Sequence, residues 1–275
     1  MDQPRQPSSD RDLFSRHAAK LTITALDGIP LVQPGDDLAG LLLSSLEGMG
    51  ESFRDGDILV LAQKIVSKSE GRYVDLADVT PSARALELAG EVDKDPRLVE
   101  VILSEAVDIV RYRKGVLVVA HRCGAVLANA GIDRSNIDQP DDGNELGTSI
   151  LLLPEDPDRS CAALRKILRQ RTGAHIGIVI NDSLGRAWRN GTVGAAIGAA
   201  GIEALLDLNG RPDLFDRPLQ STQVALADEL AAAASLVMGQ ADEGRPAVLI
   251  RGLAGGRGEG TAADLVRPRD QDLFR

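Results

Sequence analysis

Two separate stretches of the chain present carboxylates where a metal ion could bind. Asp133 follows a short run rich in small residues at 128–131, and Asp182, with Ser183 beside it, ends the apolar run 175–182. Hard divalent cations prefer oxygen ligands, which carboxylate and hydroxyl side chains supply. Each aspartate could instead cap a local turn or a helix, so a structural interpretation stands beside the metal-binding one.

Basic residues accompany these carboxylates. Lys64 and Lys68, two of the six lysines in the chain, come just after the apolar run 58–62. A lysine can neutralise phosphate oxygens as a point charge, although a solvated pair at a sheet edge is the plainer alternative. Arg186 and Arg189, a few residues beyond the second aspartate, can clamp a phosphate or a carboxylate, and we expect them to hold an acidic acceptor.

A glycine-containing loop at residues 238–246 is either a simple connection or a fourth part of the same site. Two aspartates, a lysine pair and such a loop together favour metal-assisted phosphoryl chemistry. The sequence has no P-loop motif, no G-x-G-x-x-G after a strand, no G-x-S-x-G and no H-E-x-x-H. Any nucleotide site is therefore of another kind.

Short apolar runs that alternate with helical patterns predict the elements that hold these residues. Their alternation predicts a mixed α/β or α+β protein. A glycine-rich stretch at 191–206 is either tightly packed or approaches a ligand, and 135–149 is predicted as a surface loop. The predicted strands cover residues 58–62, 116–120, 175–182 and 247–252. The predicted helices cover residues 96–111 after the N-cap Asp95, residues 158–172 before Gly173, and residues 222–238.

The composition excludes several classes of protein. The 275 residues carry 31 Lys and Arg against 41 Asp and Glu, a net charge of -10, and only 3% are aromatic. This balance argues against nucleic-acid binding, and no apolar run is long enough to cross a membrane. Two cysteines cannot make a disulfide framework, so we expect a cytoplasmic protein. Residues 1–20 are predicted to be a flexible tail, followed by one domain at 21–275.

Several segments resemble the coenzyme F420-0:L-glutamate ligase (F420-0 gamma-glutamyl ligase) family. The most specific are ANAGIDRSN at residues 128–136 and DSLGRAWRNG at residues 182–191. The resemblance spans residues 21–275 and suggests the stand-alone form, without the flavin-dependent C-terminal domain of some relatives. It implies an α+β fold of mixed sheets with flanking helices, two related subdomains and a homodimer.

The resemblance also implies an activity. A member of this family is a GTP-dependent ligase that adds L-glutamate to coenzyme F420-0 through an acyl phosphate, with further γ-linked glutamates as an option. Its cofactors would be Mg²⁺ or Mn²⁺, with K⁺ as a candidate monovalent ion. Two alternatives stay open: a ligase of the same fold that acts on a different carboxylate, and a catalytically silent nucleotide-binding protein.

Carried over by position, the resemblance assigns site residues. The first metal falls on Asp133 and Asp182, and the second on Ser183 and Gln240. Archaeal members have threonine at the position of Ser183 and glutamate at that of Gln240. A neutral glutamine is a weaker ligand, so the second metal depends on help from Asp242 or Glu243. Gln63 and Lys64 replace a pair of small hydroxyl residues. The implied GTP contacts are Ile29, Pro30, Leu31, Val32, Gln63, Lys64, Lys68, Asn136, Met238, Gly239, Gln240, Ala241, Asp242, Glu243, Gly244 and Arg245.

Overall fold

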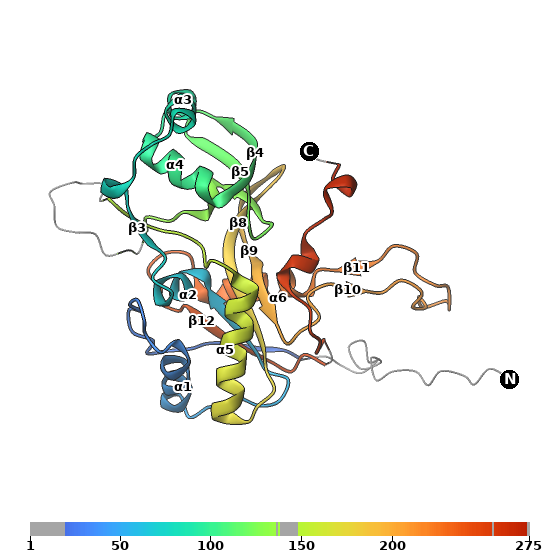
Figure 1. Ribbon diagram of the computed structural model, residues 1–275. Coiled ribbons are helices and arrows are strands. Elements are labelled where there is room, and N and C mark those ends of the chain that lie inside the picture. The colour runs from blue at the N-terminus through green and yellow to red at the C-terminus, as the bar shows by residue number, and fades with distance from the viewer. Residues whose placement is uncertain (1–19, 136, 138–147, 255, 274–275) are drawn as a thin grey trace.

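A five-stranded mixed sheet forms the centre of the protein (Figure 1). The computed structural model describes residues 20–135, 137, 148–254 and 256–273. Strands β2 and β8 are parallel, and the other neighbouring strands are antiparallel. In sheet order the strands are β1 (Thr22–Ala25), β12 (Ala247–Arg251), β2 (Ile58–Ala62), β8 (Gly177–Arg186) and β9 (Arg189–Ala200).

Helices cover both faces of this sheet, which explains why its strands are almost continuously aliphatic. On one face, α1 (Leu38–Gly48), α2 (Gln63–Ser69) and α5 (Pro157–Thr172) pack on a core that includes Ile178 and Ile180. On the other face, α6 (Leu226–Met238) packs over Val179. The fold is α+β, with mixed sheets and flanking helices, as the sequence predicts.

A smaller unit lies beyond one end of the sheet (Figure 1). In it, α3 (Ala83–Val92) and α4 (Pro96–Glu105) pack on a sheet of β4 (Ala106–Arg113), β5 (Val116–His121) and β6 (Val126–Ala128). The short helix η3 (Asn129–Gly131) leaves β6 and leads to Asp133. That this unit is related to the rest of the chain stays a prediction.

Short pairings and single helical turns join these parts. One two-stranded sheet pairs β3 (Tyr73–Asp75) with β7 (Ser149–Leu151), and another pairs β10 (Leu206–Asp207) with β11 (Gln223–Val224). The chain between β10 and β11 extends away from the central sheet (Figure 1). The remaining turns are η2 (Leu76–Asp78), η4 (Ala262–Leu265) and η5 (Arg269–Gln271).

Most predicted elements are confirmed. The strands at 58–62, 116–120 and 247–252 correspond to β2, β5 and β12. Asp95 caps α4 through the backbone N–H of Arg97, and Gly173 ends α5 in the left-handed conformation, with φ of 77°. Of the described helices, none is long and apolar enough to cross a membrane.

Three expectations need correction. The helix predicted at 222–238 begins only at Leu226, because residues 223–224 pair with β10. Strand β8 runs on to Arg186 instead of ending near 182, since the glycine-rich stretch that follows is mostly its antiparallel partner β9. The helix predicted at 96–111 ends at Glu105, because residues 106–113 form β4 and pair with β5.

The loop predicted at 135–149 falls mostly outside the described residues, as do residues 1–19 of the predicted tail, so neither prediction is tested.

Tight packing explains two glycines of β9, Gly194 and Gly198. A Cβ atom on Gly198 would lie 2.6 Å from the backbone of Pro157 in α5, and one on Gly194 would lie 2.5 Å from the carbonyl oxygen of Ala231 in α6. Real Cβ atoms do not come this close, so β9 can lie between the two helices only because these positions have no side chain. This favours tight packing over ligand approach at 191–206.

A buried carboxylate connects the smaller unit to the central body. Glu105, at the end of α4, accepts hydrogen bonds from Arg72 at 3.0 and 3.2 Å, and it pairs with Arg122 at 2.7 Å and with Nε2 of His121 at 3.3 Å. The Nε atom of Arg72 also donates to the carbonyl oxygen of Leu153 at 2.9 Å. Arg72 therefore links the segment after α2 to α4 and to the segment after β7.

We expect Glu105→Ala to lower the free energy of unfolding by about 3 kcal/mol, because it leaves half-buried cations without their counter-charge. The side chain of Glu105 is only 6% exposed. Urea denaturation of the variant and the wild type measures the difference. The matched control is Glu87→Ala, which removes a 62% exposed partner of Arg84 and should leave the urea midpoint unchanged. Equal shifts in the two variants would contradict a bridging role for Glu105.

Candidate metal and nucleotide site

Lys64 and Asp133 form an ion pair between α2 and the segment after η3. The ammonium of Lys64 lies 2.8 Å from Oδ2 of Asp133 and donates to the hydroxyl of Ser135 at 2.8 Å. The other carboxylate oxygen of Asp133 accepts from the backbone N–H of Ser135 at 2.7 Å and from its hydroxyl at 2.8 Å. The turn expected as the structural alternative for Asp133 therefore occurs, together with an ion pair to Lys64.

The sheet register brings Asp182 to the same place. Ala62, the last residue of β2, pairs with Asn181 in the parallel strand β8, so Lys64 and Asp182 both follow directly from one edge of the sheet. Asp182 is close enough to Asp133 and Lys64 to feel the charge of each. Two predicted carboxylates and one predicted lysine, distant in sequence, thus converge.

The two carboxyl groups experience opposite electrostatic conditions. Burial raises the pKa of Asp182, and the negative charge of Asp133 raises it further, against the opposing effects of Lys64 and the backbone N–H of Ser183. Burial would also raise the pKa of Asp133, but the hydrogen bonds from Lys64 and Ser135 outweigh it and hold that pKa below its ordinary value. The pair therefore has one compensating cation for two carboxylates.

This donor set fits a hard divalent cation. A metal ion near both carboxylates would neutralise the charge that burial makes costly, and the ammonium of Lys64 already supplies a positive charge at Asp133. In the part of the chain that the structure describes, no three His, Cys, Asp or Glu side chains cluster as a metal site. The remaining ligands would be hydroxyl, amide, water or phosphate oxygens, as is usual for Mg²⁺.

A second oxygen pair lies on the other side of β8. Successive side chains of a strand point to opposite faces, so Ser183 points away from Asp182 and toward α6. Its hydroxyl donates to Oε1 of Gln240 at 2.6 Å, and Nε2 of Gln240 donates to the hydroxyl of Ser235 at 2.9 Å. Asp182 and Ser183 are therefore not one ligand pair, whereas Ser183 and Gln240 are neighbours, as the resemblance implies.

The loop after α6 folds onto itself. The carboxylate of Glu243 accepts from the backbone N–H of Ala241 at 2.8 Å, and it packs against Gly239, where a side chain would overlap it. Hydrogen bonds from the loop backbone, that of Ala241 first, lower the pKa of Glu243. In this conformation the carboxylate of Glu243 therefore stabilises its own loop. Asp242, Gly244 and Arg245 are exposed.

Several residues with predicted GTP contacts have structural roles. Gln63 is buried and accepts from the hydroxyl of Ser67 at 2.9 Å within α2, and Met238 belongs to the core beneath α6. Val32 is also a core residue, while Leu31 beside it is exposed. The remaining residues are Ile29 and Pro30 in the loop after β1, Lys68 on α2, and Asn136, which lies outside the described residues.

Arg186 and Arg189 lie at the tip of the β8–β9 hairpin and are exposed. The guanidinium of Arg186 donates to the carbonyl oxygen of Asn190 at 3.3 Å. Arg186 is four residues beyond Asp182 along the strand, which is about 13 Å at the usual rise per residue. A ligand that touches both must be extended.

Sequence reasoning missed two hydroxyl groups that hold the candidate ligands. Ser135 fixes the carboxylate of Asp133 and contacts Lys64, and Ser235 fixes the amide of Gln240. The first has a local signal, because a serine two residues after an aspartate is typical of a turn closed by the aspartate side chain. The second is five residues from its partner, across a helix end, and no local pattern indicates it.

The chain matches the family model for F420-0:gamma-glutamyl ligase over residues 28–252. That span contains both carboxylates, Lys64 and Gln240. The chain belongs to this family. Family membership makes it a ligase.

Curated relatives agree with this assignment. A protein of Methanothermobacter thermautotrophicus named coenzyme F420:L-glutamate ligase is 48% identical over 257 residues, which cover 93% of this chain and 99% of the relative. Proteins of the same name from Methanocaldococcus jannaschii and Methanopyrus kandleri are 46% and 45% identical. These alignments cover 80% and 91% of this chain, and 85% and 97% of the two relatives.

We expect the ligase to bind Mn²⁺, and Asp133→Asn or Asp182→Asn to weaken that binding at least about tenfold, because each removes one of the two charged ligands. Electron paramagnetic resonance of free Mn²⁺ measures the affinity. Asp78→Asn, an exposed aspartate on η2, is the matched control and should bind Mn²⁺ as the wild type does. Gln240→Glu should tighten binding of a second ion, since it adds charge beside Ser183. Wild-type affinity in both aspartate variants would exclude the acidic pair as ligands.

Proposed function

We propose that this chain is a GTP-dependent ligase that joins L-glutamate to coenzyme F420-0, with further γ-linked additions as an option. One observation carries the proposal: Asp133, Asp182 and Lys64 converge at one sheet edge in a member of the F420-0:gamma-glutamyl ligase family. The curated relatives with the corresponding name support the choice of substrates. A homodimer with Mg²⁺ or Mn²⁺ and a candidate K⁺ requirement belongs to the same proposal.

The chemistry requires activation of a carboxylate. Formation of an amide from a carboxylate and an amine is uphill in water, so the carboxylate must first gain a better leaving group. Transfer of the γ-phosphoryl group of GTP to the carboxylate of F420-0 gives an acyl phosphate and GDP. The unprotonated amine of glutamate then attacks the acyl carbon, the bond from that carbon to the phosphate oxygen breaks, and the proton lost by the nitrogen leaves with the released phosphate.

The residues at this end of the sheet suit a reaction that brings several anionic groups together. Divalent cations, when bound, would neutralise phosphate oxygens, and Asp133 and Asp182 would hold the first while Ser183 and Gln240 would hold the second. Lys64 is a flexible point charge that can move its ammonium from Asp133 to a phosphate oxygen. Burial keeps water from screening these charges, which strengthens each interaction.

The exposed loops beside this edge would bind the rest of the substrates. We assign contacts with the guanine nucleotide to the segments at 29–32 and 239–245 and to Lys68. Arg186 and Arg189, on the hairpin tip, are placed at the acidic acceptor, which must then extend along β8. Arginine suits this task because its planar guanidinium can bind a carboxylate or phosphate with two hydrogen bonds.

The mass spectrum of the products tests the proposal as a whole. The protein is incubated with F420-0, L-glutamate, Mg²⁺ or Mn²⁺, and either GTP or ATP. We expect one or more glutamyl additions to F420-0 with GTP, and hydroxylamine in place of glutamate should yield the hydroxamate expected of an acyl phosphate. Equal turnover with ATP would overturn the GTP assignment. Addition only to another carboxylic acid would support the first alternative, and no hydrolysis or transfer at all would support a silent binding protein.

We expect Asp133→Asn and Asp182→Asn to lower ligation at least about 100-fold while the fold stays intact, because both substrates of the first step are anionic and lose their cation. Product formation by mass spectrometry gives the rate, and circular dichroism checks the fold. Asp78→Asn should ligate as the wild type does. Retained metal-dependent turnover in both aspartate variants would remove these residues from the proposed mechanism.

A further inference from the structure

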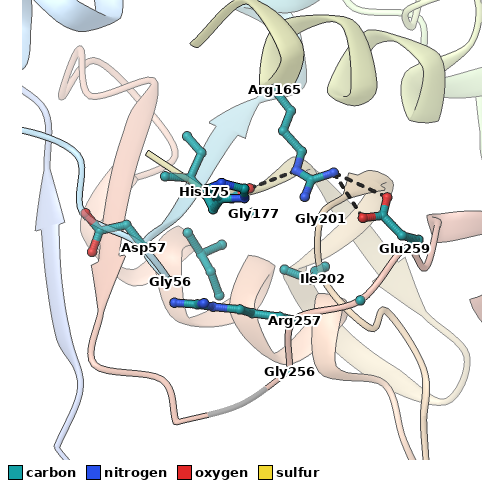
Figure 2. Close-up of a pocket in the computed structure, with 13 residues that line it drawn as sticks. Gly56, Asp57, Arg165, His175, Gly177, Gly201, Ile202, Gly256, Arg257 and Glu259 are labelled. Atoms are coloured by element: carbon teal, nitrogen blue, oxygen red, sulfur yellow. Dashed lines mark hydrogen bonds and ion pairs between the residues drawn. The ribbon is translucent and has the colours of Figure 1, made fainter. Parts of the chain in front are cut away.

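A cavity of about 280 Å³ lies at the opposite end of the central strands from the acidic pair (Figure 2). Its lining includes Ile58 and Gly177, where β2 and β8 begin. Gly177 precedes Asp182 by five residues of the same strand, which is about 16 Å at the usual rise. The cavity is therefore separate from the candidate metal and nucleotide site.

Arg165 of α5 forms one side of this cavity. Its Nε atom donates to the carbonyl oxygen of Ile176 at 3.0 Å, which fixes the guanidinium plane. Gly201 has a φ of 76°, and a side chain there would overlap this guanidinium. The remaining pairing of Arg165, with Glu259, is long at 3.3–3.4 Å, and the side chain of Glu259 is 83% exposed. Such an exposed pair is weak, so Glu259 can give way to another anion.

Arg257 forms the opposite side, as Figure 2 shows. It belongs to the segment after β12, and its Nη2 atom lies 2.8 Å from where a Cβ atom of Gly56 would be. Among the described residues, its guanidinium has no hydrogen-bonded or ion-paired partner. Two guanidinium groups that face one cavity repel each other, and an anion between them would remove that cost.

The acidic residues near the cavity already accept hydrogen bonds from other groups. Asp57 lines it, but both of its carboxylate oxygens accept from Arg251 at 2.8 Å, and one also accepts from the backbone N–H of Arg54. The exposed carboxylate of Asp55 accepts from the backbone N–H of His175 at 2.7 Å, and the positive charge of Arg257 contributes to lowering its pKa. The ring of His175 also lines the cavity. Arg165 and Arg257 are therefore the cationic groups of the cavity wall, and an anion that binds between them competes with the exposed carboxylates of Glu259 and Asp55.

We propose that this cavity binds a small oxyanion, a phosphate or carboxylate group, between Arg165 and Arg257, with His175 beside it. Guanidinium groups match both kinds of group with paired hydrogen bonds, and one of the two here is held in place by the backbone before any ligand arrives. The volume admits the anionic group with a small organic portion attached. The inference does not depend on the proposed ligase reaction, because it uses none of the residues placed in that site.

Titration calorimetry with inorganic phosphate, on protein that has been freed of metal ions and then dialysed free of chelator to exclude metal-dependent binding at the acidic pair, tests the proposal. We expect saturable binding that Arg257→Gln weakens about tenfold or more. Glu259→Gln should tighten binding, because it removes the competing carboxylate from Arg165. Arg217→Gln is the matched control, since this arginine stacks on Phe215 in the segment between β10 and β11, and it should leave the affinity unchanged. A parallel titration with L-glutamate separates a carboxylate ligand from a phosphate ligand.

The ring protons of His175 locate the bound anion by nuclear magnetic resonance. The chain has only three histidines, so their signals are readily assigned with single variants. We expect His175 to shift on titration while the buried His121 does not, and we expect the shift to persist in Asp182→Asn. Binding of either anion that Arg257→Gln weakens supports the proposal. No saturable binding of phosphate or L-glutamate, or undiminished binding in Arg257→Gln, would overturn it whether or not the protein ligates glutamate.

Discussion

The approach of Asp133 and Asp182 is the constraint on which the site depends. Two half-buried carboxylates repel each other, and the structure supplies one ammonium, from Lys64, within hydrogen-bonding distance of the first. The remaining negative charge is what makes this edge of the sheet a place for a cation. The parallel pairing of β2 with β8 creates the arrangement, because Ala62 lies opposite Asn181 and delivers both following segments to one edge.

The second oxygen pair has the opposite character. The hydroxyl of Ser183 donates to the amide oxygen of Gln240, and the amide nitrogen of Gln240 donates to Ser235. All three side chains are neutral, so this pair carries no charge that a cation would have to balance. The acidic pair is costly without a cation, whereas the neutral pair is stable without one. A carboxylate in place of the Gln240 amide would give the second oxygen pair a negative charge, as the acidic pair has. Because Gln240 is neutral, we expect binding of a second metal ion to depend more strongly on the phosphate oxygens of a bound substrate.

Sequence reasoning predicted the parts of the fold that local chemistry determines. Buried strands such as 58–62 are continuously aliphatic, and Asp95, Pro96 and Gly173 mark helix ends through hydrogen bonds and φ angles of their own. It failed where pairing is non-local. Strand β8 continues through polar residues to Arg186 because β9 pairs with it. Helix α6 begins later than predicted because residues 223–224 form β11 and pair with β10. The opposite orientations of Asp182 and Ser183 follow from that continuation, so the residue pattern alone did not indicate the separation of the two oxygen pairs, which only the family resemblance implied.

The same parallel strands also explain why the two sites differ in charge. A net charge of -10 repels anionic ligands, so any site for them needs local positive charge. Beyond the carboxyl end of β2 and within the last part of β8, Lys64 alone among the described residues offsets the two carboxylates of Asp133 and Asp182, and a bound ion would supply the further positive charge. At the amino ends it comes from Arg165 and Arg257, which glycines at positions 201 and 56 allow to lie against the backbone. Because parallel strands place like ends together, the two arrangements remain a full strand length apart, and the arginines cannot neutralise the carboxylates that attract the ion.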